Sequence, residues 1–185
     1  RILLTPFLIL CLFWENAWGH PTALIIFIVA SITDAYDGYY ARKYDQITPE
    51  GKFLDPLADK ILVSSAFISF ALMGIIEPWM VILIIFRDLF VTGLRMVMER
   101  KGLSLVTSTI AKAKTATQMG IICFILIVLG LKGISLAWAK PMLEIIGEYR
   151  LVYNLTLGVT VFTMLTGITY LYANRQAIQD FLGKE

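Results

Sequence analysis

Four aspartates stand in two pairs in neighbouring stretches of the chain. Asp34 and Asp37 are three residues apart and Asp55 and Asp59 are four apart, so each pair shares one face of a helix. Carboxylates gathered at one end of a bundle repel one another unless a cation lies between them. Hard divalent cations prefer oxygen ligands, and two of them about 3.5–4 Å apart form a clamp for transfer at phosphorus. The spacing therefore favours a site for two ions of Mg²⁺ or Mn²⁺ over solvated acids or ion pairs with nearby lysines and arginines.

Small residues accompany the aspartates. Gly38 and Ala41 fall on the same side of the first predicted helix as its two aspartates, and Gly51 precedes Asp55 by one turn. Residues with little or no side chain let a bulky ligand approach the backbone. The alternative is tight helix–helix packing, which small residues also serve in membranes. The spacing alone leaves both readings open.

A second set of charged residues lies further along the chain. It comprises Arg87 beside Asp88, Arg95 about two turns later, and Lys112 with Lys114. Arginine and lysine are the usual partners of phosphate oxygens, so these residues could hold a phosphate-bearing ligand. The alternative is that Arg87 pairs with Asp88 or another helix while the others are ordinary basic residues near a membrane surface.

The composition indicates a membrane protein. Of the 185 residues, 58% are hydrophobic and only 16% are charged, with a mean hydropathy of +0.74. Soluble domains carry about 25% charged residues, so a water-soluble enzyme, a disordered chain and a disulfide scaffold are disfavoured. The net charge of +2 comes without a basic tail, so we expect no nucleic-acid partner. Cys11 and Cys123 lie in apolar runs and indicate no thiol chemistry.

The apolar runs predict an all-α bundle of six transmembrane helices in a single domain spanning 1–185. The predicted spans are 2–14, 21–44, 51–76, 79–97, 107–131 and 151–173, and 132–150 suits an interfacial half-helix. The third and fifth spans are polar at their beginnings. Because the chain opens at Arg1 without a methionine, we expect a truncated N-terminus.

The basic residues predict an orientation for this bundle. One side holds eleven lysines and arginines and the other holds three, and short cytoplasmic loops collect positive charge. We therefore expect a multi-pass protein of the cell (inner) membrane, with both termini and the aspartates at the cytoplasmic face. The sole histidine, His20, falls near the opposite face, so we do not expect it to act as an acid or base.

The aspartates and small residues together form a longer pattern, Asp34-x2-Asp37-Gly38-x2-Ala41-Arg42-x8-Gly51-x3-Asp55-x3-Asp59. This pattern resembles, without a gap, the signature of the CDP-alcohol phosphatidyltransferase family, and the resemblance extends over about residues 1–175. Members of that family are six-helix membrane enzymes in which an alcohol displaces CMP from a CDP-linked substrate. No side chain competes as a nucleophile, so direct in-line displacement is expected rather than a phospho-enzyme.

The resemblance implies a role for each residue of the signature. Asp34, Asp37, Asp55 and Asp59 would ligate the metals, and Asp59 would also be the catalytic base on the incoming hydroxyl. The nucleotide would be bound by Asp34, Gly38, Ala41, Arg42 and Gly51. The small residues would make room for the cytidine nucleotide, and Arg42 would pair with a carboxylate or phosphate.

Local strings narrow the acceptor alcohol. Residues 53–60, Arg87-Asp88 with 91–95, and 111–115 with Gln118 look like the members of the family that use sn-glycerol 3-phosphate and make phosphatidylglycerol phosphate. CDP-diacylglycerol would then be the donor. The acceptor phosphate would meet Arg95 first, then Lys112, Lys114 and Arg87. Family members that make phosphatidylinositol phosphate, phosphatidylserine or cardiolipin remain alternatives.

Two other classes of protein compete with the enzyme. A divalent-cation transporter could use the same aspartates as an ion path, but it would need carboxylates or broken helices near the midplane of several spans. Here the four aspartates gather towards one face. A structural membrane subunit gives no reason for the spacing. The resemblance, rather than the residues themselves, implies a homodimer.

Overall fold

The computed structural model is entirely α-helical over the residues that it describes, which are 2–43, 49–100, 109–134 and 137–182. Within these ranges, the side chains at 34–35, 37–43, 49–57, 59, 99–100, 109–112, 137 and 180–182 lie outside the description. The elements are α1 (Leu4–Leu12), α2 (Gly19–Lys43), α3 (Pro49–Leu72), α4 (Pro78–Arg100), α5 (Thr109–Ile134), a 3-10 turn (Ala137–Ala139), α6 (Lys140–Glu148), α7 (Leu151–Ala173) and α8 (Arg175–Leu182). The prediction of an all-α fold is confirmed.

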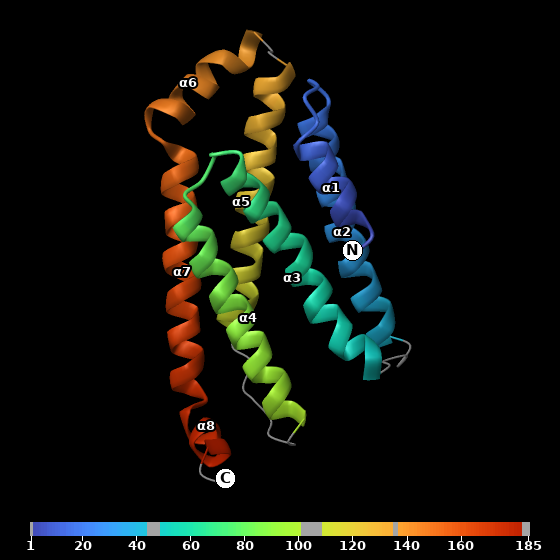
Figure 1. Ribbon diagram of the computed structural model, residues 1–185, viewed down its shortest axis with the longest axis vertical. Helices are drawn as coiled ribbons and strands as arrows, with labels where there is room; N and C mark the ends of the chain where they lie inside the picture. Colours follow the sequence, from blue (N-terminus) through green and yellow to red (C-terminus); the bar gives the residue numbers. More distant parts are fainter. Residues whose placement is uncertain (1, 44–48, 101–108, 135–136, 183–185) are drawn as a thin grey trace.

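The long helices run up and down the bundle, so that their ends gather in two places (Figure 1). At one end α2 and α4 finish, α3 and α5 begin, and α7 leads into α8. We call this the motif end, because the aspartate pairs lie on α2 and α3 towards it. At the opposite end, α6 crosses between α5 and α7. Residues far apart in the sequence are therefore brought to the motif end by topology alone.

An apolar core joins α1 to α5. Its buried residues include Leu8 and Leu12 of α1, Phe27 of α2, and Phe67 and Phe70 of α3. The other fully buried apolar side chains of the core are Ala23, Ala30, Leu62, Ala66, Ile122, Ile125 and Leu126. Contact between α2 and α5 and between α1 and α2 is extensive. α3, which carries the second aspartate pair, is packed against α1, α4 and α5.

α7 packs in a different way, with a polar inner face. Its buried residues are Thr156, Thr160, Thr163, Thr166 and Gly167. Three of these hydroxyls are satisfied within the helix, since those of Thr156, Thr160 and Thr166 donate to backbone carbonyls of the preceding turn at 2.7–2.8 Å. Its exposed apolar residues lie on other positions: Leu155, Val161, Leu165, Ile168 and Tyr172. An apolar outside and a small, hydroxyl-bearing inside are typical of a helix that faces lipid.

Among the described residues, two helical segments are long and apolar enough to cross a membrane: Ala113–Ile134 within α5, and α7. Gly19–Thr33 and Lys60–Leu72 are shorter apolar segments. Large apolar side chains are exposed on the other helices too, including Ile25, Phe86 and Phe90. The prediction of a membrane protein is consistent with these helices, and the count of six spans remains a prediction.

The boundaries of the helices follow the expected spans closely, with two differences. α3 ends at Leu72 rather than 76, because Gly74 adopts a left-handed conformation (φ 70°) and Ile75 donates back to the Phe70 carbonyl at 2.9 Å, which is a Schellman cap. α8, which follows α7 after Asn174, was not predicted. The expected half-helix within 132–150 corresponds to the 3-10 turn and α6.

Candidate active site

The four signature aspartates occupy the positions that the topology brings to the motif end. Asp34 and Asp37 are in the second half of α2, and Asp55 and Asp59 are in the first half of α3. The helical spacing on which the metal hypothesis depends is therefore present in both helices. Their side chains lie outside the described residues, so their role as metal ligands stays a prediction.

The predicted nucleotide-binding residues lie on the same two helices. Gly38, Ala41 and Arg42 belong to α2, and Gly51 belongs to the first turn of α3. Lys112, one of the predicted acceptor residues, is in the first turn of α5. The side chains of all five also lie outside the described residues.

Asp88 on α4 is the centre of a buried ionic cluster. Its carboxylate is only 3% exposed and contacts three cations. Lys114 of α5 donates to one oxygen, Arg87 donates to the same oxygen at 3.2 Å, and Lys60 of α3 lies 3.4 Å from the other. We call Asp88 and these three cations the Asp88 cluster. It connects three helices, because its members come from α3, α4 and α5.

Arg87 is held from the opposite side by α7. Its guanidinium donates through a terminal nitrogen to the hydroxyl of Thr166 at 3.1 Å. Gly167 lies directly beside the arginine side chain, since a Cβ added there would come within 3.0 Å of Cγ and 3.2 Å of Nε. A fourth helix therefore fixes the orientation of the cluster, and only a residue without a side chain allows this close approach.

The described part of the Asp88 cluster carries more positive than negative charge. Three cations surround one carboxylate, and Lys114 is only 2% exposed. A buried charge is costly unless it is paired and hydrogen-bonded. Among the described residues, Nε of Arg87 and Oε1 of Gln118 are buried without a hydrogen-bond partner.

Gln118 extends the polar contacts one turn further along α5 from Lys114. Its side-chain nitrogen donates to the hydroxyl of Thr163 on α7 at 3.4 Å, and the residue is 1% exposed. Arg95 is half-buried on α4, about two turns beyond Arg87. The polar contacts between α4, α5 and α7 thus lie outside the apolar core of α1 to α5.

The structure places two of the predicted acceptor residues, Arg87 and Lys114, in the Asp88 cluster. The pairing of Arg87 with Asp88 that was weighed as the alternative is present. The phosphate role of both residues stays a prediction. Sequence reasoning missed Lys60, Thr166 and Gly167 as members of this site. The spacing of Lys114 and Gln118, one helical turn apart, was a usable signal for a polar face.

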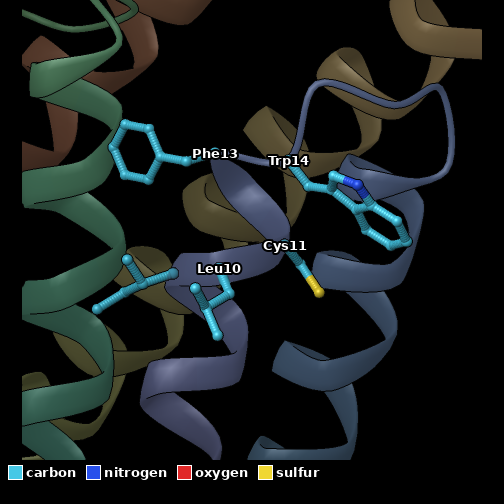
Figure 2. A pocket seen from close by; sticks show the side chains of 5 residues that line it. Leu10, Cys11, Phe13 and Trp14 are labelled. Carbon is cyan, nitrogen blue, oxygen red and sulfur yellow. The ribbon is translucent and has the colours of Figure 1, made fainter.

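An apolar pocket lies away from these charges, along α1. It has a volume of about 420 Å³ and is lined by Ile9, Leu10, Cys11, Phe13 and Trp14. Figure 2 shows the Phe13 and Trp14 side chains pointing in opposite directions from the end of α1. The lining has no charged side chain, so this pocket is not suited to a nucleotide or a phosphate.

Among the side chains that the structure describes, no three histidine, cysteine, aspartate or glutamate residues come together as a metal site. The signature aspartates are not part of that set. Their chemistry nevertheless fits a divalent ion, because about one turn on each of two consecutive helices carries two carboxylates, and these turns lie towards the motif end.

Comparison with known proteins agrees with the signature. The family model for CDP-alcohol phosphatidyltransferase matches residues 1–147. A Bacillus subtilis protein named CDP-diacylglycerol--glycerol-3-phosphate 3-phosphatidyltransferase is 42% identical over 131 residues, which cover 64% of this chain and 68% of that protein. Proteins of the same name from Rickettsia felis and Salmonella choleraesuis are each 34% identical, over 94% and 97% of this chain and 90% and 93% of their own lengths. The chain therefore belongs to the CDP-alcohol phosphatidyltransferase family.

Proposed function

We propose that this protein transfers the phosphatidyl group of CDP-diacylglycerol to sn-glycerol 3-phosphate, giving phosphatidylglycerol phosphate and CMP in phospholipid biosynthesis. The observation that carries the proposal is the identity of about a third of the residues, over nearly the whole chain, with relatives whose name states this donor and this acceptor. The uninterrupted signature on α2 and α3 supports the family reaction independently of those names.

The proposed step is a direct displacement at phosphorus. A free hydroxyl oxygen of the acceptor attacks the phosphorus of the phosphatidyl group, and its proton passes to the carboxylate of Asp59. The bond between that phosphorus and the bridging oxygen of the pyrophosphate breaks, and CMP leaves with the electron pair. This step needs no covalent intermediate with the protein.

Asp34, Asp37, Asp55 and Asp59 would hold the divalent ions, Mg²⁺ or Mn²⁺ and two in number. Bound there, the ions neutralise negative charge on the two phosphates of the donor and on the oxygen atoms of the reacting phosphorus. The chain's own contribution is to fix the donor in place. Gly38, Ala41 and Gly51 leave space for the nucleotide, and Arg42 offers a cation to a phosphate or carboxylate.

The acceptor would be held by the basic residues that follow the motif. Arg95, half-buried on α4, is our first choice for binding its phosphate, and Lys112 is our second choice. Arg87 and Lys114 extend the positive charge inward, and the buried Oε1 of Gln118 could accept a hydrogen bond from a hydroxyl of the acceptor. A guanidinium can bind phosphate through two parallel hydrogen bonds, which favours arginine at the principal position.

We place the protein in the cell (inner) membrane with the motif end at the cytoplasmic face. The six spans would be α1 to α5 and α7, with α6 lying at the opposite membrane surface. The excess of lysine and arginine at the motif end and the exposed apolar side chains of these helices support this arrangement. A homodimer is the assembly that the family resemblance implies.

A purified, detergent-solubilised enzyme tests the proposal. CMP release from CDP-diacylglycerol should depend on sn-glycerol 3-phosphate and exceed the rates obtained with serine, inositol 1-phosphate or phosphatidylglycerol as acceptor. A preference for serine or inositol 1-phosphate would leave only the family reaction. Uptake of Mn²⁺ into vesicles without CMP release would favour the transporter instead.

A further inference from the structure

A single buried carboxylate organises three cations from three helices. Asp88 contacts Lys60 of α3, Arg87 of α4 and Lys114 of α5, and it is more deeply buried than Lys60, which is 14% exposed. We propose that Asp88 is a positioning residue of the enzyme, which holds these three cations in the arrangement that receives the phosphate of the acceptor. This inference rests on the proposed function and assigns to that site a residue of opposite charge to its ligand.

Asp88 is an anion among three cations. By itself, an anion at this place would weaken phosphate binding, since like charges repel. Three cations gathered without it would, however, repel one another more strongly, and at low dielectric that repulsion is large. Asp88 offsets part of that repulsion, so Lys60, Arg87 and Lys114 can lie close together as a site for the dianionic phosphate of glycerol 3-phosphate.

The geometry gives Asp88 a second task. Lys114 and Arg87 share one carboxylate oxygen, while Lys60 contacts the other, so the two oxygens divide the cations between α3 on one side and α4 and α5 on the other. Lys60 directly follows Asp59, the proposed base, in α3. A carboxylate at 88 thereby connects the helix of the base with the helices that carry the acceptor residues.

The role is distinct from ordinary helix packing, because neighbouring contacts already perform that function. Arg87 is fixed on its far side by Thr166 and Gly167, and Gln118 joins α5 to α7 through Thr163. Loss of Asp88 should therefore change where the cationic groups of the lysines lie more than whether the helices associate.

The test uses Asp88→Asn, which keeps the shape and removes the charge, and Asp88→Glu, which keeps the charge on a longer arm. Glu144→Gln is the control, since it removes a carboxylate on the exposed surface of α6 at the other end of the bundle. In Asp88→Asn we expect the KM for sn-glycerol 3-phosphate to rise about tenfold or more, with the KM for CDP-diacylglycerol within about twofold of the parent. The KM of Asp88→Glu for sn-glycerol 3-phosphate should fall between the values of the parent and of Asp88→Asn. The control should have the KM values of the parent.

Two results would overturn the proposal. One is an Asp88→Asn enzyme with the parent's acceptor KM, and the other is an equal rise of both KM values, which is the pattern of a general structural role. If Asp88→Asn cannot be extracted as a folded protein, Asp88→Glu decides, and an unchanged acceptor KM in that variant contradicts the proposal. A parent enzyme that uses serine but not glycerol 3-phosphate would contradict the proposed function instead, and the two failures are therefore distinguishable.

Discussion

The ammonium nitrogen of Lys60 lies 3.4 Å from a carboxylate oxygen of Asp88, although 28 residues separate them in the chain. This ion pair joins the helix that carries Asp55 and Asp59 to the helix that carries Arg87 and Arg95. The ion pair therefore links the position of the basic residues to the position of the signature aspartates.

Gly167→Ala should disturb the position of the Arg87 side chain. The added Cβ would lie 3.0 Å from Arg87 Cγ, so the arginine side chain must shift by a few tenths of an ångström, and we expect this shift to disturb its hydrogen bond to Thr166. Loss of one hydrogen bond to a charged group costs about 1.5–3 kcal/mol, and we expect the KM for glycerol 3-phosphate to rise about tenfold. Steady-state CMP release at varied acceptor concentration measures this effect.

Gly158→Ala provides the matched control for that variant. It makes the same substitution on the same helix, but no atom lies within 4 Å of the added Cβ. Its KM should equal that of the parent, and its melting temperature should be equal or higher because alanine favours the helix. Equal acceptor KM values for the two alanine variants would show that the packing of Gly167 against Arg87 has no influence on acceptor binding.

Asp34→Asn, Asp37→Asn and Asp55→Asn should each remove most activity while leaving an extractable, folded protein. An amide keeps the size of the side chain but is a poorer ligand for a divalent cation than a carboxylate. EDTA should have the same effect on the parent, and added Mg²⁺ or Mn²⁺ should restore the rate. CMP release near the parental rate in the chelated enzyme would contradict a metal-dependent reaction.

Ala41→Leu should weaken use of the donor. Ala41 lies one turn beyond Asp37 on α2, where the proposal requires space for the nucleotide. We expect a KM for CDP-diacylglycerol at least about tenfold higher, with a melting temperature within a few degrees of the parent. If donor saturation is unchanged and only the melting temperature falls, Ala41 serves helix packing.

Arg95→Ala should raise the KM for glycerol 3-phosphate sharply, by about tenfold or more, and leave donor saturation nearly intact. Arg95→Lys should restore the acceptor KM only in part, because lysine offers a charge without the planar fork of arginine. The pair of variants separates charge from geometry. Full rescue by lysine would reduce the role of Arg95 to its charge, and no effect in either variant would remove it from the acceptor site.

Much of the fold could be predicted because hydrophobicity sets the length of each helix. The interval from Leu151 to Ala173 was read directly from its apolar run, and it agrees with the bounds of α7. The end of α3 was misplaced by four residues because apolar residues continue beyond Leu72, whereas the left-handed turn at Gly74 ends the helix. α8 was missed because it is short and amphipathic, whereas the predicted helices were recognised by long apolar runs.

Some features of the site could be predicted from residues close together in the sequence, and others depend on contacts between distant helices. The spacing of the aspartates, and the alternative that Arg87 pairs with Asp88, could be read because both depend on residues close in sequence. The contacts of Lys60 and Lys114 with Asp88 could not, since they depend on how three helices pack. The threonines of α7 also gave no signal, because threonine is common on both lipid-facing and buried helix faces and only packing showed which positions point inward.

The most direct measurement follows both products of the purified enzyme with CDP-diacylglycerol and sn-glycerol 3-phosphate. Mass spectrometry of the lipid extract, together with quantitation of CMP, gives the stoichiometry of the transfer. We predict one CMP for each new phosphatidylglycerol phosphate, and neither product in Asp59→Asn. Release of CMP without the appearance of that lipid, or formation of the lipid at the parental rate in Asp59→Asn, would contradict the account.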